Sequence, residues 1–298
     1  MHRVTPETDL IVVGGGPAGC AAAVMASSLG LRCVLIEPSR LCHKPRHISA
    51  MVNVLGGFAD GPDLADRVSA DVTAADRCDV RLGRGVTAVR AGDDHVRVDL
   101  DDGSSLEAPY AVVATGARPQ TAAETEWISQ DREVDAPALW EADPSALAGA
   151  QALVLGADRP LGTLLRTRPD LAMRLLVRYS PAEAYKVEEV RADPRVVLLP
   201  TGHLDLRHDP YGVLHADAAD GHRYTGRDVY LNLGSRPVVP AGDLRTDGSG
   251  YCPPEIQHSR ILVAGDLRGA RFQRVMTAFG SGAEAALTAY YAAHGLLG

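Results

Sequence analysis

The sequence has almost no lysine and contains no long apolar run. Only Lys44 and Lys186 are lysines among its 30 basic residues, which we attribute to a GC-rich genome. No stretch of eighteen or more apolar residues occurs, so the sequence predicts no membrane-spanning helix. Acidic residues outnumber basic ones and give a net charge of -8, which argues against a nucleic-acid partner because phosphate binding needs a positive face.

The chain also lacks the cysteine spacing of a disulfide framework or a metal site. Its five cysteines are irregularly placed, at Cys20, Cys33, Cys42, Cys78 and Cys252. Four histidines between residues 203 and 222 have no ligand spacing, so we expect no metal. The polar segment 1–9 lacks the apolar core of a signal peptide. We therefore expect a cytoplasmic protein with reduced thiols.

The beginning of the chain carries the strongest motif. The length of 298 residues suggests two domains, and the first opens with an apolar run at 9–13 that predicts a buried strand. Glycines at 14, 15, 16 and 19 follow at once, then an alanine-rich helix expected over 20–29 and a second strand at 33–36 that ends in Glu37. This order of strand, glycine turn, helix, strand and acid is typical of a dinucleotide-binding fold.

Each residue of the motif has a chemical reason. Gly14 allows the tight turn, Gly16 lets the backbone approach a pyrophosphate, and Gly19 lets the helix pack on the sheet. The helix N-terminus then offers its free N–H groups to the phosphates. Glu37 can accept both hydroxyls of an adenosine ribose and disfavours a 2'-phosphate, so the motif predicts FAD or NAD(H) and not NADP(H).

Three later motifs resemble one known family. A strand leads into a glycine turn at 111–119, another strand ends in Gly-Asp at 261–266, and a helix of small residues is expected over 272–286. In this order they resemble the two-dinucleotide-domain flavoprotein disulfide reductases, most closely the thioredoxin reductase-like branch, over nearly the whole chain. The resemblance implies an α/β fold with two Rossmann-like domains. An FAD domain of residues 1–118 and 240–298 is split by a smaller NAD(P)H-like domain of residues 119–239, which we expect to be degenerate, and the protein is expected to be a homodimer.

The resemblance also assigns the cofactor as FAD and its contacts. Asp266 would hold a ribityl hydroxyl, the backbone at Arg274 and Val275 would meet the flavin pyrimidine edge, and Asn53 would lie close to the flavin. The full set of residues expected to bind FAD is Gly14, Gly16, Pro17, Ala18, Gly19, Glu37, Asn53, Val86, Thr115, Gly116, Gly265, Asp266, Arg274 and Val275.

The sequence departs from the family at both other sites. The segment 134–141, where the family has its redox-active Cys-x-x-Cys, contains no cysteine, which excludes a thiol relay there. In the second glycine motif Asp158 replaces the middle glycine and places a negative charge where a pyrophosphate would lie, and Leu161 replaces a small residue. Arg178 stands where the family has arginines for a 2'-phosphate. We expect NAD(P)H to be excluded; the alternative is that Arg159 compensates for Asp158.

The segment 38–48 is the expected place of substrate chemistry. It contains Cys42, His43 and His47 among three cations. A histidine near a flavin can act as general base, and His47 is preferred because it is closer to Asn53. Because Pro45 bars a regular helix, we expect the two imidazoles to point in different directions. Cys42 beside cations is a candidate redox thiol. The alternative is a solvated loop whose cations meet the FAD phosphates.

These observations predict an FAD-dependent oxidoreductase without a dithiol. The preferred hypothesis is an oxidase or dehydrogenase that takes two electrons from a small substrate, free or tethered to a carrier protein in secondary metabolism, and passes them to dioxygen. In its frame it resembles the dithiol oxidases of natural-product pathways. Two alternatives remain open: an NAD(P)H-dependent flavoprotein reductase, and a non-catalytic flavoprotein or redox sensor.

Overall fold

The computed structural model describes residues 8–48, 50–51, 53–219 and 221–296. The chain divides into two compact units, which we treat separately. Unit 1 combines the residues up to 118 with residues 237–298, and unit 2 consists of residues 119–236. The chain passes from one to the other through β8 (Ala117–Pro119) and β17 (Ser235–Pro237), which pair with each other.

Unit 1 is built on a parallel five-stranded sheet in the order β19-β7-β1-β2-β3. Its strands are β1 (Leu10–Val13), β2 (Cys33–Glu37), β3 (Cys78–Leu82), β7 (Tyr110–Val113) and β19 (Ile261–Val263). Successive side chains of β1 point to opposite faces: Leu10 and Val12 pack in a core with the helices, while Ile11 and Val13 pack in a second core. The sheet is therefore buried on both faces, as parallel sheets are.

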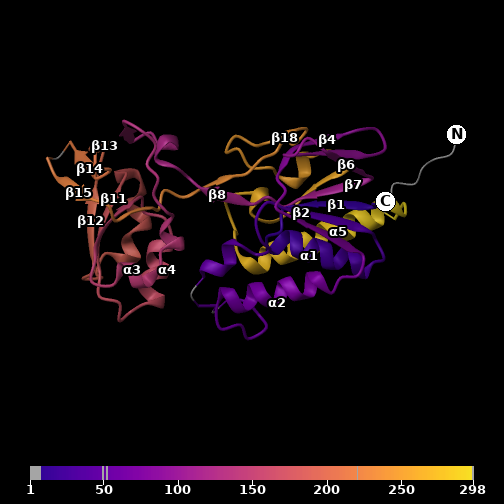
Figure 1. Cartoon of the computed structure of the whole chain (residues 1–298), viewed down its shortest axis with the longest axis horizontal. Helices are drawn as coiled ribbons and strands as arrows, with labels where there is room; N and C mark the ends of the chain where they lie inside the picture. Colours follow the sequence, from indigo (N-terminus) through magenta and orange to yellow (C-terminus); the bar gives the residue numbers. More distant parts are fainter. Residues whose placement is uncertain (1–7, 49, 52, 220, 297–298) are drawn as a thin grey trace. The chain divides into compact units, whose positions relative to one another are not determined.

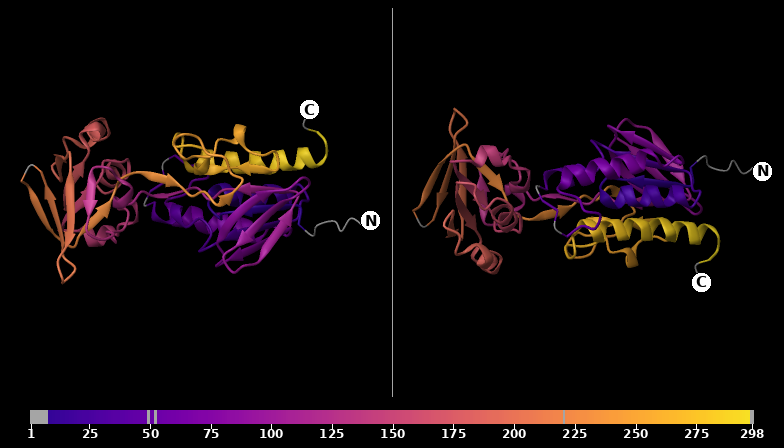
Figure 2. Two further views of the ribbon diagram at one scale, coloured as in Figure 1. Left: turned by 90° about the horizontal axis from the view of Figure 1, so that it is seen from above. Right: turned by 90° about the horizontal axis from the view of Figure 1, so that it is seen from below.

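Helices cover the first face and an antiparallel sheet covers the second (Figure 1). The helices are α1 (Pro17–Ser28), α2 (Gly61–Thr73) and α5 (Val275–Ala293), and the covering strands are β4 (Val86–Ala91), β5 (Val96–Leu100), β6 (Ser105–Ala108) and β18 (Ala241–Gly242). The two further views in Figure 2 also show α5 beside α1. A Cβ added at Gly282 of α5 would lie 1.9 Å from the carbonyl oxygen of Ala18, so glycine is what allows this close approach. The helix expected from residue 272 begins at Val275.

Unit 2 contains a second parallel sheet in the order β12-β11-β10-β16 and a separate sheet in the order β15-β14-β13-β9. The first has β10 (Gln151–Leu155), β11 (Arg174–Tyr179), β12 (Val196–Pro200) and β16 (Val229–Leu231). The second has β9 (Ile128–Gln130), β13 (Leu204–His208), β14 (Leu214–Ala218) and β15 (Arg223–Gly226). Its helices are α3 (Pro144–Leu147) and α4 (Pro160–Thr167).

The two units repeat one backbone arrangement around their first glycine. Gly14 has φ +101° and donates from its N–H to the carbonyl of Ile36 at 2.8 Å; Gly156 has φ +103° and donates to the carbonyl of Arg178 at 2.7 Å. A Cβ on Gly14 would lie 2.5 Å from the carbonyl oxygen of Ala114, and one on Gly156 would lie 2.2 Å from that of Asn232. The expected pair of Rossmann-like folds is confirmed. Every helix within the described residues is too short or too polar to pass through a bilayer.

Candidate flavin site

The glycine turn of unit 1 leaves the beginning of α1 open. A Cβ on Gly19 would lie 1.7 Å from the carbonyl oxygen of Gly14, so the helix can follow this turn only without a side chain there. Gly16 has an extended backbone, provides no side-chain cap, and has no atom within 4 Å of the position a Cβ would take. Pro17 and Ala18 then form the first turn of the helix. The uncapped N–H groups and the space over Gly16 fit a pyrophosphate.

Glu37 faces this turn from the end of β2. One carboxylate oxygen accepts the N–H of Gly15 at 2.8 Å, and the other accepts the N–H and the hydroxyl of Ser39 at 3.0 and 2.8 Å. A carboxylate has about four lone-pair sites, so it retains capacity for ribose hydroxyls. The turn and the acid therefore have the arrangement expected for an adenosine diphosphate group.

Other residues expected at the adenine and ribityl parts are placed on unit 1 as follows. Gly116 has φ +69° after β7, and the hydroxyl of Thr115 donates to the carbonyl of Val238. Val86 begins β4. Asn53 lies in an exposed bend, and nothing in the described residues brings it to the glycine turn.

The flavin end of the expected site is built from the segment between β19 and α5. The N–H of Gly265, which has φ +70°, donates to the hydroxyl of Ser281 at 2.9 Å. Arg274 is the N-cap residue of α5 and Val275 its first residue. The ammonium group of Lys44 lies 3.6 Å from a carboxylate oxygen of Asp266, so the segment after Glu37 reaches the expected ribityl-binding acid.

Hydrogen bonds and close packing fix the segment after Glu37. The N–H of Cys42 donates to the carbonyl of Gly15 at 2.8 Å. Residues Lys44–His47 form the 3₁₀ helix η1, whose Arg46 pairs at 2.6 Å with Asp66 of α2. A Cβ on Gly61 would lie 1.7 Å from the carbonyl oxygen of Pro45. The picture of a solvated loop is wrong for Leu41, Cys42 and Pro45, which are buried.

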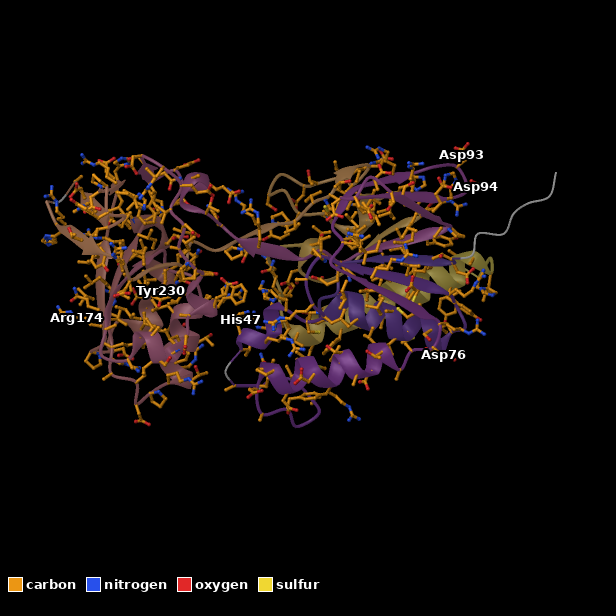
Figure 3. All side chains as sticks on the ribbon, in the orientation of Figure 1. His47, Asp76, Asp93, Asp94, Arg174 and Tyr230 are labelled. Carbon is orange, nitrogen blue, oxygen red and sulfur yellow. The ribbon has the colours of Figure 1, made fainter. Side chains whose placement is uncertain are left out.

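The two histidines of this segment lie together. Their ring centroids are 5.2 Å apart in an edge-to-face arrangement, so the expectation that His43 and His47 point in different directions was wrong. The reason is that Pro45 occupies the first turn of a short helix, where its missing N–H costs no hydrogen bond. His43 is exposed and its Nδ1 accepts from Arg40 at 3.2 Å, whereas His47 is half-buried. Figure 3 labels His47 at the end of unit 1 opposite to Asp76, which precedes β3.

The turn after β10 in unit 2 keeps the backbone of a nucleotide site and loses its side-chain chemistry. The N–H of Asp158 donates to the carbonyl of Asn232 at 3.1 Å, and its carbonyl accepts the side-chain amide of Asn232 at 2.8 Å. Leu161 is buried at the position that corresponds to Gly19. Lys186 lies near Asp158: burial opposes its charge, but the hydrogen bond to Glu183 and the charges of Glu183 and Asp158 together raise the pKa of Lys186.

Arg178 is not available to a 2'-phosphate in this structure, so that expectation was wrong. Its side chain is 2% exposed and donates to the hydroxyl of Thr201 at 3.1 Å and to the carbonyl of His222 at 3.3 Å. The register explains this, because Arg178 pairs with Leu155 as Ile36 pairs with Val13 in unit 1. Arg178 thus corresponds to a buried strand residue, and the residue that corresponds to Glu37 is the buried Tyr179.

Sequence reasoning missed four features of the two sites. They are the pair Lys44–Asp266, the contact of Cys20 with Cys42, the inward course of Arg178 and the proximity of Lys186 to Asp158. The first three depend on tertiary contacts that no local pattern predicts. The register of Arg178 could have been found by aligning the two glycine motifs strand by strand.

Comparisons with known proteins agree with this architecture. Residues 8–122 match the family model described as pyridine nucleotide-disulphide oxidoreductase. A Pseudomonas putida protein named as part of an alkyl hydroperoxide reductase, its F subunit, is 24% identical over 95% of this chain and 57% of its own length. A protein named NADH dehydrogenase from Ferdinandcohnia aciditolerans is 22% identical over the same shares. The chain therefore spans little more than half the length of these curated relatives.

Solved structures with the same fold include two thioredoxin reductases. That of Lactococcus lactis has a TM-score of 0.71 at 17% identity, covering 95% of this chain and 98% of the other. That of T. acidophilum has a TM-score of 0.73 at 16% identity, covering 96% and 99%. At these identities the likeness is one of fold.

Proposed function

The chain is a thioredoxin reductase-like member of the pyridine nucleotide-disulphide oxidoreductases, a family of FAD-dependent oxidoreductases, and from that premise we propose that it oxidises a small substrate without using NAD(P)H. Two electrons leave the substrate, free or tethered to a carrier protein, and reach dioxygen through FAD. The substrate loses two hydrogens and dioxygen becomes hydrogen peroxide, so the reaction balances. The protein would act as a homodimer, as its family resemblance implies.

FAD fits unit 1 through residues that are already arranged. The open N-terminus of α1 and the turn of Gly14–Gly19 would hold the pyrophosphate, and Glu37 would hold the adenosine ribose. Asp266 would hold the ribityl chain, with Lys44 beside it. When bound, the flavin supplies two-electron redox chemistry. The N-terminus of α5, a helix of 19 residues, would favour negative charge on the flavin pyrimidine edge if that edge meets Arg274 and Val275.

The observation that carries this proposal is the state of the second dinucleotide site. The carboxylate of Asp158 stands where the family backbone approaches a pyrophosphate, and Tyr179, buried, stands where an acid would hold a ribose. Arg178 is turned inward and engaged by Thr201 and His222. All five cysteines belong to unit 1, so unit 2 offers no dithiol. With neither a nicotinamide site nor a relay, electrons have to come from the substrate itself.

The chain's own proton chemistry would be supplied by the histidine pair. His47 is half-buried beside His43, and the segment that carries it reaches Asp266 through Lys44. We assign His47 as the general base, since imidazole titrates near neutral pH and removal of a proton must accompany removal of a hydride. Arg40 holds the Nδ1 atom of His43 as an acceptor and so orients the neighbouring ring.

A second candidate is an NAD(P)H-dependent reductase. The names of the relatives support it, because those given above are reductases and a dehydrogenase. Lys186 supports it as well, since a cation beside Asp158 offsets the negative charge that would repel a pyrophosphate.

Anaerobic stopped-flow mixing separates the two candidates. The flavin absorbance of the purified protein should stay oxidised for seconds in millimolar NADH or NADPH and bleach with dithionite, the positive control. The variant Asp158→Gly should stay unreactive as well, because Arg178 and Tyr179 still block the family's way of binding. Rapid bleaching of the wild type would make the reductase the correct assignment. Bleaching by a member of an amine and thiol panel, followed by peroxide formation on admission of air, is the result expected of the oxidase.

A further inference from the structure

Two cysteines that are far apart in the sequence lie in contact beside the glycine turn of unit 1. The sulfur of Cys20, in α1, is 3.9 Å from the sulfur of Cys42, in the segment after Glu37. Both are reduced, and both are within 1% of complete burial. The carbonyl oxygen of Gly15 accepts the thiol of Cys20 at 3.2 Å and the N–H of Cys42 at 2.8 Å. The pair therefore sits directly on the turn that faces the pyrophosphate.

The backbone at Cys42 is held in an unusual conformation. Its φ is +52°, and among the described residues only Phe272 shares a positive φ without being glycine. A β-carbon disfavours this region, so such a conformation persists only where surrounding contacts impose it. Here it directs the side chain of Cys42 inward to Cys20 and away from the nearby cations.

We propose that Cys20 and Cys42 are a reversible redox pair, which a hydroperoxide converts to a disulfide that fastens the segment after Glu37 to α1 at the pyrophosphate turn. The formation of the disulfide stands on the geometry alone, whereas its effect on cofactor retention rests on FAD binding at this turn. No part of the proposed substrate oxidation uses these thiols.

The chemistry needs one peroxide and releases two waters. The sulfur of Cys42 attacks the O–O bond, which breaks to give a sulfenic acid and the first water. The sulfur of Cys20 then displaces the sulfenic oxygen, the S–S bond forms, and the second water carries away the remaining thiol proton. The order follows from the hydrogen bond with Cys42 and from burial, which together raise the pKa of the Cys20 thiol and keep it protonated.

The required movement is small. A disulfide has sulfur atoms about 2.05 Å apart, and a change of rotamer at one cysteine moves its sulfur by more than the remaining gap. Burial also sets the oxidant, because hydrogen peroxide can reach the pair through small fluctuations while a bulky disulfide such as oxidised glutathione cannot. A second thiol pair, Cys33 opposite Cys78 on β2 and β3, provides an internal comparison because Cys78 is only half-buried.

Peptide mapping of the wild-type holoprotein tests the cross-link directly. Trypsin places each cysteine on its own peptide: 4–32, 33–40, 41–46, 78–81 and 246–260, where the bond between Lys44 and Pro45 resists cleavage. After treatment with hydrogen peroxide and alkylation in denaturant, we expect peptide 4–32 joined to peptide 41–46 and released by dithiothreitol. Oxidised glutathione should leave both peptides unmodified. Absence of this joined peptide, or a mixed disulfide with glutathione at either cysteine, would overturn the proposal.

Variants and cofactor release test its consequence. Cys20→Ser and Cys42→Ser should each lose the cross-link, while Cys78→Ser, the matched control, should keep it. In the wild type the oxidised form should unfold at a Tm about 5 °C higher, since the new loop restricts the unfolded chain. FAD should dissociate from it severalfold more slowly. A cross-link without either shift would refute the role as a fastener, whereas a protein purified without FAD would count against the proposed function and leave the mapping result intact.

Discussion

Lys44 and Asp266, at the two ends of the chain's first unit, lie 3.6 Å apart as an ion pair. Their side chains are 44% and 23% exposed, and a pair so open to water adds little to stability. Its importance is one of position, because it brings the segment after Glu37, with its cation and histidines, to the acid expected to hold the ribityl chain of FAD. The candidate site is assembled by this contact from two segments that the sequence keeps far apart.

Replacing Lys44 should affect the cofactor more than the fold. We expect Lys44→Met to change the free energy of unfolding of the apoprotein by less than about 1 kcal/mol, since the ion pair is exposed. FAD should bind more weakly, because a cation beside an anionic cofactor is lost. Fluorescence titration with FAD measures this. Lys186→Met, at the only other lysine, is the matched control and should bind FAD as the wild type does; equal binding by both variants would place the segment away from the cofactor.

Removing the carboxylate of Glu37 should weaken both the turn and FAD binding. In Glu37→Ala the N–H of Gly15 loses its 2.8 Å partner, a loss that costs about 1–3 kcal/mol, and the ribose loses its acceptor. FAD content after gel filtration should fall well below one per chain. Glu255→Ala, at an exposed acid of the same unit, should retain it. Full FAD content in Glu37→Ala would show that this acid does not hold the ribose.

Two glycines of α5 should respond in opposite ways to the same substitution. Gly282→Ala places a Cβ 1.9 Å from the carbonyl oxygen of Ala18 and should force α5 away from α1, lowering the Tm. Gly280→Ala meets no atom within 4 Å and should raise stability by about 0.5–1 kcal/mol through helix propensity. Thermal unfolding of both variants decides this, and a Tm for Gly282→Ala at or above that of the wild type would contradict the close packing of the two helices.

His47→Ala should lower turnover by about 10²-fold with any substrate that bleaches the flavin, and it should leave FAD content unchanged. His43→Ala is the comparison, because its exposed ring contacts His47 and should have the smaller effect. The pH dependence of flavin reduction should lose its near-neutral limb only in His47→Ala. A larger loss in His43→Ala would transfer the assignment of the base to that residue.

Native alkylation should distinguish the cysteines by pH. The hydrogen bond with Cys33 outweighs burial and lowers the pKa of the Cys78 thiol, so its reactive thiolate forms at a lower pH than that of a free cysteine. Contact with Cys42 and burial raise the pKa of the Cys20 thiol, which should stay unreactive up to pH 9. Iodoacetamide labelling followed by the tryptic map measures both. Labelling of Cys20 before Cys78 would contradict this order.

Much of the first unit could be predicted from local sequence. The apolar run that forms β1, the glycines at 14, 16 and 19, and Glu37 at the end of β2 determine a dinucleotide turn, because each requirement is met within a few residues. The absence of cysteine from residues 134–141 likewise excludes a family dithiol there without any coordinates. The replacement of a motif glycine by Asp158 is also legible in the sequence alone.

The tertiary structure decided what these elements do together. Arg178 looked like a phosphate ligand by its place in the order of residues, but strand register turned it into the interior, where Thr201 and His222 bind it. Pro45 suggested diverging histidines, yet the 3₁₀ helix it begins packs on α2 and holds the two rings in contact. Only folding brings Lys44 to Asp266 and Cys20 to Cys42. Local patterns report the backbone each segment prefers, whereas side-chain partners across a fold depend on register and packing, which no single segment contains.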